Sequence, residues 1–159
     1  MSGLAWLIVV SVLLGAIVGI VLAWRPLRRF CQEVELVHAQ ELFLLQREYL
    51  EAKFFDMGAQ SEKPRGLRWK ECEWDKQVEF VRDRRNGKLL AFVGVLISFE
   101  PTNADMETAS WQEPRTATAV FYFNGRKWQV GRVLFNMNPE QVLAHYPEME
   151  RLEPSTGRD

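Results

Sequence analysis

The sequence predicts an α+β protein that carries a transmembrane helix at its amino terminus. Three observations predict this class. The first 24 residues contain no Lys, Arg, Asp, Glu or His, residues 26–57 show helical spacing, and residues 67–135 change to the alternation of strands with two Asn-Gly turns. The expected order is a transmembrane helix, a long helix, an antiparallel sheet of about five strands and a short carboxyl-terminal helix.

The transmembrane prediction comes from residues 4–24, which form an uncharged run of 21 residues. A helix of this length measures about 31 Å, which matches the hydrocarbon core of a bilayer. Trp6 and Trp24 lie near its two ends, where indole rings prefer the headgroup region. The run lacks the basic start of a cleavable signal peptide and exceeds its apolar region of about 7–15 residues. We therefore expect an uncleaved, single-pass signal anchor.

The charges that flank this run predict its orientation. Arg25, Arg28 and Arg29 follow it, whereas only the α-amino group precedes it. The positive-inside rule then places the amino terminus outside the cell membrane and residues 25–159 in the cytoplasm. Reduced Cys31 and Cys72 agree with a cytoplasmic location, because disulfides are rare there.

Four small residues recur at every fourth position of the anchor and share one stripe of the helix: Ser11, Gly15, Gly19 and Ala23. Two membrane helices can approach closely along such a groove. The stripe predicts helix–helix packing with a second copy or with another membrane protein. The alternative is that Gly and Ala are simply common in membrane helices.

A second helix is expected over residues 26–57. Pro26 suits the first turn of a helix, and Gly58 is a natural C′ stop before the loop at residues 59–66. The second half of the helix is apolar over more than half of its circumference, which indicates packing against a sheet. A coiled coil is the weaker alternative, because three of its heptad positions are poor: Ala39, Gln46 and Lys53.

Five strands are expected between residues 67 and 135. Asn86-Gly87 and Asn124-Gly125 are strong hairpin signals, and a polar loop is expected over residues 100–114. The strand at residues 89–99 is apolar on both faces. One face should meet the long helix. The other needs cover from the short helix, the loop, another subunit or the bilayer surface.

The short helix is predicted by Asn138 as N-cap, Pro139 at the first position and Gln141 at the third, and it should end near Tyr146. The rest is expected to be a frayed tail. The predicted organisation is therefore an anchor at 1–25, a juxtamembrane helix at 26–58, an antiparallel β domain with the short helix at 59–147, and a flexible tail at 148–159.

A long helix followed by an antiparallel meander resembles the cystatin-like and NTF2-like rolls, in which a curved sheet wraps a helix. This resemblance concerns the order of the elements alone. Such folds contain both enzymes and passive modules, so the fold does not select a function.

The sequence offers little chemistry. The 20 basic and 21 acidic residues give a net charge of −1, which does not favour nucleic-acid binding. His38 and His145 have no nucleophile or metal partner in motif spacing, and Asp105 and Glu107 lack the spacing of a Ca²⁺ loop. No nucleotide, zinc or hydrolase motif occurs. We predict no catalytic residue, cofactor or metal.

Two charged groups admit a weaker functional interpretation beside a structural one. The first group is a cluster of four carboxylates, Glu71, Glu73, Asp75 and Glu79. They could act in acid–base catalysis, but the favoured interpretation is a solvated sheet face with ion pairs. The second group is the basic hairpin tip formed by Arg84, Arg85 and Lys88. It could contact anionic lipid headgroups, although a few exposed basic residues attract them only weakly.

Four segments together resemble an uncharacterised family of small bacterial membrane-anchored proteins: "GLRWKECEW", "FVGVLISFE", "ATAVFYFNGRKW" and "FNMNPEQ". The resemblance covers roughly residues 65–146. It implies the class and no activity, cofactor or site residue.

We therefore expect a membrane-anchored, non-enzymatic interaction or assembly module whose partners are the lipid bilayer and either itself or another membrane protein. The alternative is a small-ligand-binding domain or enzyme with a pocket between the helix and the curved sheet.

Overall fold

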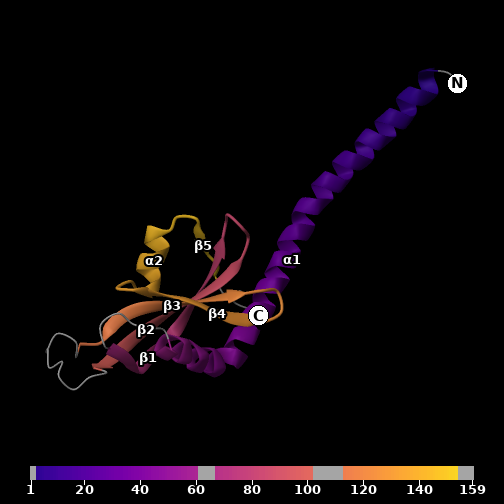
Figure 1. Cartoon of the computed structure of the whole chain (residues 1–159). Helices are drawn as coiled ribbons and strands as arrows, with labels where there is room; N and C mark the ends of the chain where they lie inside the picture. The colour runs from indigo at the N-terminus through magenta and orange to yellow at the C-terminus, as the bar shows by residue number, and fades with distance from the viewer. Residues whose placement is uncertain (1–2, 61–66, 102–112, 154–159) are drawn as a thin grey trace. The chain divides into compact units, whose positions relative to one another are not determined.

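A computed structural model of the chain describes residues 3–60, 67–101 and 113–153 (Figure 1). Side chains at residues 4, 5, 7–9 and 21–33 lie outside the described set. The chain divides into two compact units, Met1–His38 and Ala39–Asp159. The elements, in chain order, are α1 (Gly3–Gln60), β1 (Leu67–Asp83), β2 (Leu89–Pro101), β3 (Arg115–Phe123), β4 (Trp128–Phe135), α2 (Pro139–His145) and β5 (Met149–Arg151).

The predicted α+β class with a five-stranded antiparallel sheet is confirmed. The strands are ordered β4-β3-β2-β1-β5, and the sheet curls into a half-barrel (Figure 1). Two of the expected strands are in fact one, because β1 runs through both with register shifts between Trp69 and Glu71 and between Trp74 and Val78. The fifth strand, β5, forms where the sequence predicted a frayed tail, and it pairs with residues 81–83 of β1.

Both Asn-Gly hairpins form as predicted. Gly87 has φ +70° and Gly125 has φ +87°, a left-handed backbone that glycine adopts without steric cost. The Asn86 side chain accepts a hydrogen bond from the backbone N–H of Lys88, and the Asn124 side chain accepts from that of Lys127. These short turns fix the antiparallel register of the strands on either side.

The main core lies between the α1 segment that begins at Ala39 and one face of the sheet. Phe43 is 1% exposed, and its ring meets Phe80, Phe121 and Trp128 with centroids 5.0–5.7 Å apart. The indole N–H of Trp128 donates a hydrogen bond of 2.7 Å to the backbone carbonyl of Ala39. That contact satisfies a buried polar group while joining β4 to the helix.

The opposite face of the sheet is covered within the chain by α2, which settles one question that the sequence left open. Val142 of α2 is buried with Val81, Phe92 and Val120. The predicted capping box is present, since the Asn138 side chain accepts from Gln141 N–H while the Gln141 side chain accepts from Asn138 N–H. The cap therefore sets where α2 begins on the sheet.

Helix α1 departs from the prediction at two places. It continues through Pro26, where we expected a new helix to begin, and it ends at Gln60 instead of Met57. Gly58 is thus not a C′ stop but a buried residue of the last turn. A Cβ atom placed there would lie 2.5 Å from the Trp69 ring, so close approach of the indole explains the glycine.

We predict that Gly58→Ala destabilises the second unit by about 1–3 kcal/mol through overpacking against Trp69. Urea unfolding followed by far-UV circular dichroism measures this loss. In a double-mutant cycle, Gly58→Ala should cost much less stability in the Trp69→Leu background than in the unchanged chain. The reason is that Trp69→Leu removes the ring that the new methyl group would contact. An additive pair would contradict the steric explanation.

Candidate functional site

The structure describes only some of the predicted membrane and packing residues. In the unit Met1–His38, Trp6 is 69% exposed. Ser11, Gly15 and Gly19 lie on exposed helix, and a Cβ atom at either glycine would meet nothing within 4 Å. The other predicted side chains lie outside the described residues: Ala23, Trp24, Arg25, Arg28 and Arg29.

The helix segment at residues 10–20 is uncharged. Every residue from 10 to 20 is exposed, and Val12, Leu14 and Ile20 each exceed 55%. Within the described residues, no helix has the length and hydropathy that a membrane crossing needs.

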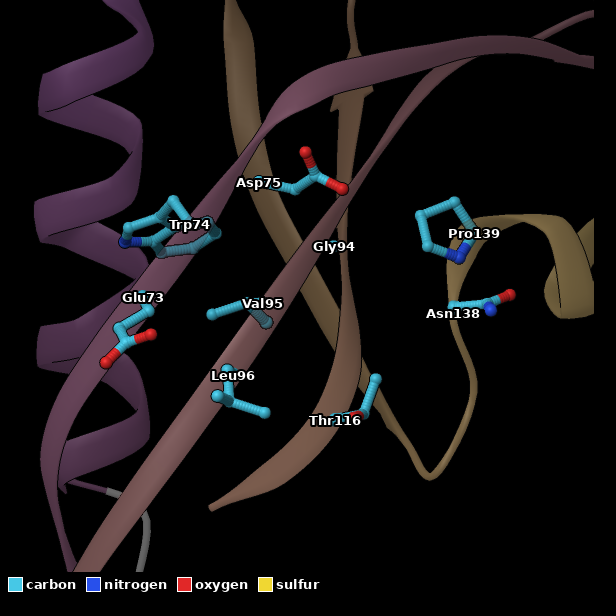
Figure 2. Close-up of a pocket in the computed structure, with 9 residues that line it drawn as sticks. All are labelled: Glu73, Trp74, Asp75, Gly94, Val95, Leu96, Thr116, Asn138 and Pro139. Carbon is cyan, nitrogen blue, oxygen red and sulfur yellow. The ribbon is translucent and has the colours of Figure 1, made fainter.

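A first surface pocket, lined by described residues, has a volume of about 310 Å³ and lies where β1, β2 and β3 meet the start of α2 (Figure 2). Asp75 and Pro139 flank the backbone of Gly94, as Figure 2 shows. A Cβ atom at Gly94 would lie 3.3 Å from Asp75 Cβ and 3.7 Å from Pro139 Cδ. The tighter of these contacts is with Asp75, so the glycine at this position eases the approach of the Asp75 side chain from β1.

The polar groups of this first pocket serve the fold. Asn138 caps α2, and the Asp75 carboxylate accepts a hydrogen bond of 3.1 Å from Gln77 N–H at the β1 register shift. Glu73 and Thr116 complete the polar lining, which contains no His, Cys or Lys among the described residues. The described lining therefore offers two carboxylates and one hydroxyl, and the Asp75 carboxylate already accepts a backbone hydrogen bond.

The second pocket, which we call the α1–β1 groove, has a volume of about 350 Å³. Its lining comes from two elements of the second unit. Helix α1 and strand β1 contribute Glu48, Glu51, Ala52, Phe55, Asp56, Cys72 and Trp74. The groove therefore combines three carboxylates with aromatic and aliphatic surface, and no pattern in the sequence predicted it.

Beside the groove, the Arg47 side chain of α1 forms hydrogen bonds with the backbone of β1. Its Nε lies 2.6 Å from Glu51 Oε1, its Nη1 donates to the Lys76 carbonyl at 2.8 Å, and its Nη2 donates to the Asp75 carbonyl. Both carbonyls lie at the β1 register shift, where the ladder to β2 is interrupted. The guanidinium thus satisfies backbone acceptors that β2 does not pair there.

We predict that Arg47→Ala destabilises the second unit by about 1.5–3 kcal/mol, because the side chain is only 20% exposed and its removal leaves two carbonyls and Glu51 without their donor. Arg47→Lys should recover less than half of this loss, since a single ammonium cannot replace the planar fork. Chemical denaturation measures both losses. Lys53→Ala on the exposed part of α1 is the control, and an equal loss there would argue against the Arg47 contacts.

Two arginines of the basic hairpin tip, Arg84 and Arg85, form ion pairs with glutamates of the carboxyl-terminal segment. Arg84 Nε lies 3.2 Å from Glu150, Arg85 binds Glu148, and Arg151 Nε lies 3.0 Å from Glu79. These contacts tie the short β5 region to β1. They favour the structural interpretation of the tip and of Glu79 over lipid binding or acid–base chemistry.

Histidine and metal chemistry find no support in the described residues. His38 and His145 are exposed, and the His145 ring packs against Tyr146 with centroids 5.0 Å apart. Within residues 3–60, 67–101 and 113–153, no three His, Cys, Asp or Glu side chains are grouped to hold a metal ion. Asp105, Glu107 and most of the expected loop at 100–114 lie outside the described ranges.

Comparison with known proteins adds no assignment. The chain matches no protein-family model, no curated protein and no solved structure. The resemblance to small bacterial membrane-anchored proteins therefore stays a prediction.

Proposed function

We propose that this protein is a membrane-anchored, non-enzymatic interaction module, with its amino terminus outside the cell membrane and the unit Ala39–Asp159 in the cytoplasm. One observation carries the proposal. The described part of α1 presents an uncharged stretch, residues 10–20, in which every residue is exposed. Leucine, valine and isoleucine exposed around a whole helix need a non-aqueous neighbour, and a bilayer supplies one.

The sequence on either side of this stretch supports the same proposal. The uncharged run extends over residues 4–24, and three arginines follow it within five positions. The run is long enough for the hydrocarbon core, and the arginines favour the cytoplasmic side.

Packing in the second unit supports an interaction role over a catalytic one. The space between α1 and the curled sheet, where a ligand pocket was the alternative, holds aromatic rings packed edge to face around Phe43 and Phe54. The two pockets described above open to solvent, and no histidine is among the described residues that line them. We also propose that this unit belongs with the cystatin-like or NTF2-like rolls.

Lateral association through the small-residue stripe is the second part of the proposal. Ser11, Gly15, Gly19 and Ala23 would allow two helices to approach, either in two copies of the chain or with another membrane protein. Gly15→Ile with Gly19→Ile should abolish cross-linked species of the full chain in native membranes. Val12→Ile with Val18→Ile is the control off the stripe, and it should leave the cross-linking pattern intact.

The outcomes separate the parts of the proposal. The anchor is tested by extracting membranes that contain the full chain with alkaline carbonate. Release of the chain into the soluble fraction would refute the proposed membrane anchor. Unchanged cross-linking in the Gly15 and Gly19 variant would refute the packing stripe and leave the anchor standing. Digestion of the folded unit by protease added to intact cells would reverse the orientation.

A further inference from the structure

The outer surface of α1 beside the α1–β1 groove is apolar and has no cover from the described chain. Leu44 is 63% exposed, Leu45 84% and Tyr49 66%. Leu44, Glu48 and Phe55 follow one another at spacings of four and seven, so they lie along one side of the helix. The exposed side chain of Leu44 therefore lies on the same side of α1 as two residues that line the groove.

The charge beside this apolar surface is mainly negative. From Ala39 to Gln60, α1 carries four acidic residues and two basic ones. Arg47 is engaged with Glu51 and two backbone carbonyls, and Lys53 Nζ lies 6.0 Å from the Tyr49 ring centroid. Within the described residues, no ion pair engages Glu48 or Asp56. Two carboxylates of the groove thus face solvent without a basic partner.

We propose that the α1–β1 groove and the adjoining Leu44–Leu45 surface dock a cationic amphipathic segment of a partner protein, in which Lys or Arg residues are spaced along an apolar face. This inference rests on the interaction role proposed above and identifies the surface that performs it. Charge complementarity selects the occupant. Carboxylates repel an anionic lipid surface, whereas they form charge-assisted hydrogen bonds with ammonium and guanidinium groups.

The side chains of the groove suit long basic residues. The aliphatic stem of Lys or Arg can pack on Phe55 and Ala52, while its charged head reaches Glu48 or Asp56. Trp74, which is half-buried in the lining, offers an indole face to a guanidinium. Apolar residues of the same segment would cover Leu44 and Leu45, in the manner of an amphipathic helix laid into a groove.

The test uses the full chain in phosphatidylcholine nanodiscs and a synthetic leucine–lysine peptide of about five helical turns. Hydrogen exchange should show protection of residues 44–56, and added salt should weaken binding. The same peptide with glutamate in place of lysine should not bind. Empty nanodiscs give the background that comes from lipid alone.

Charge reversal locates the site. Glu48→Lys with Asp56→Lys should weaken peptide binding about tenfold, because two attractions become repulsions. Glu113→Lys with Glu153→Lys makes the same change in net charge at exposed residues that do not line the groove, and it should leave affinity within about twofold. If the reversed variant does not fold, Glu48→Gln with Asp56→Asn takes its place and should weaken binding in the same direction.

The inference fails if residues 44–56 gain no protection, if the glutamate peptide binds equally well, or if both reversed pairs lose affinity alike. Its failure is distinct from that of the anchor. A chain that stays in membranes but does not bind the peptide refutes the docking site alone. A chain that binds the peptide but is released by carbonate refutes the anchor alone.

Discussion

Replacing Phe43 with alanine should lower the free energy of unfolding of the second unit by about 3–5 kcal/mol. Phe43 is 1% exposed and touches the rings of Phe80, Phe121 and Trp128, so it joins α1 to β1, β3 and β4 at once. Its removal would leave a cavity enclosed by rings from several strands, which cannot collapse easily because the sheet holds them.

Leu45→Ala is the matched control for Phe43→Ala. It removes a large apolar side chain two positions further along α1, but this side chain is 84% exposed, so the loss should stay within about 0.5 kcal/mol. Urea unfolding of the full chain in detergent, monitored by tryptophan fluorescence, measures both values. Equal losses for the two variants would mean that α1 does not form the core of this unit.

The local features of the fold could be predicted from the sequence because each depends on a few neighbouring residues. The turn glycines at 87 and 125 and the cap at Asn138 appear where their chemistry placed them. The errors occur where distant residues decide. Gly58 reads locally as a helix stop, yet Trp69 packs over it from the next element and the helix continues.

The same distinction explains β1 and β5. Residues 75–77 interrupt the alternation of β1, so the sequence suggested two strands, while Arg47 from α1 binds the carbonyls at the interruption and the strand continues. Residues 149–151 carry no strand pattern of their own. Their pairing to β1 is accompanied by ion pairs of Glu148, Glu150 and Arg151 with residues far back in the chain.

The candidate surfaces were harder to predict than the fold. The α1–β1 groove needs residues from two elements, and their juxtaposition depends on the register of helix and strand. The only local signal is the run "ELFLLQREYLEAKFF", which is apolar over more than one helix face while carrying several carboxylates. That pattern indicates more apolar surface than one sheet can cover, although it does not say where the uncovered part lies.

A single charge in the middle of the uncharged part of α1 should have the largest effect on the cellular behaviour of the protein. Ile17 is 57% exposed and lies near the centre of the run at residues 4–24. Arginine at the centre of a membrane helix costs about 2.5–3.5 kcal/mol for insertion, beyond the loss of the isoleucine contribution. After alkaline carbonate extraction, the ratio of membrane-retained to extracted protein should therefore be about 100-fold lower for Ile17→Arg than for the unchanged chain.

Leu45→Arg provides the control, because it introduces the same charge at an exposed apolar position of the same helix outside the uncharged run. It should leave membrane retention unchanged, since residue 45 belongs to the folded unit that we place in the cytoplasm. Equal release of the two variants would show that retention depends on the folded unit binding to membranes. Equal retention would show that residues 4–24 tolerate a central charge, which a single helix surrounded by lipid does not.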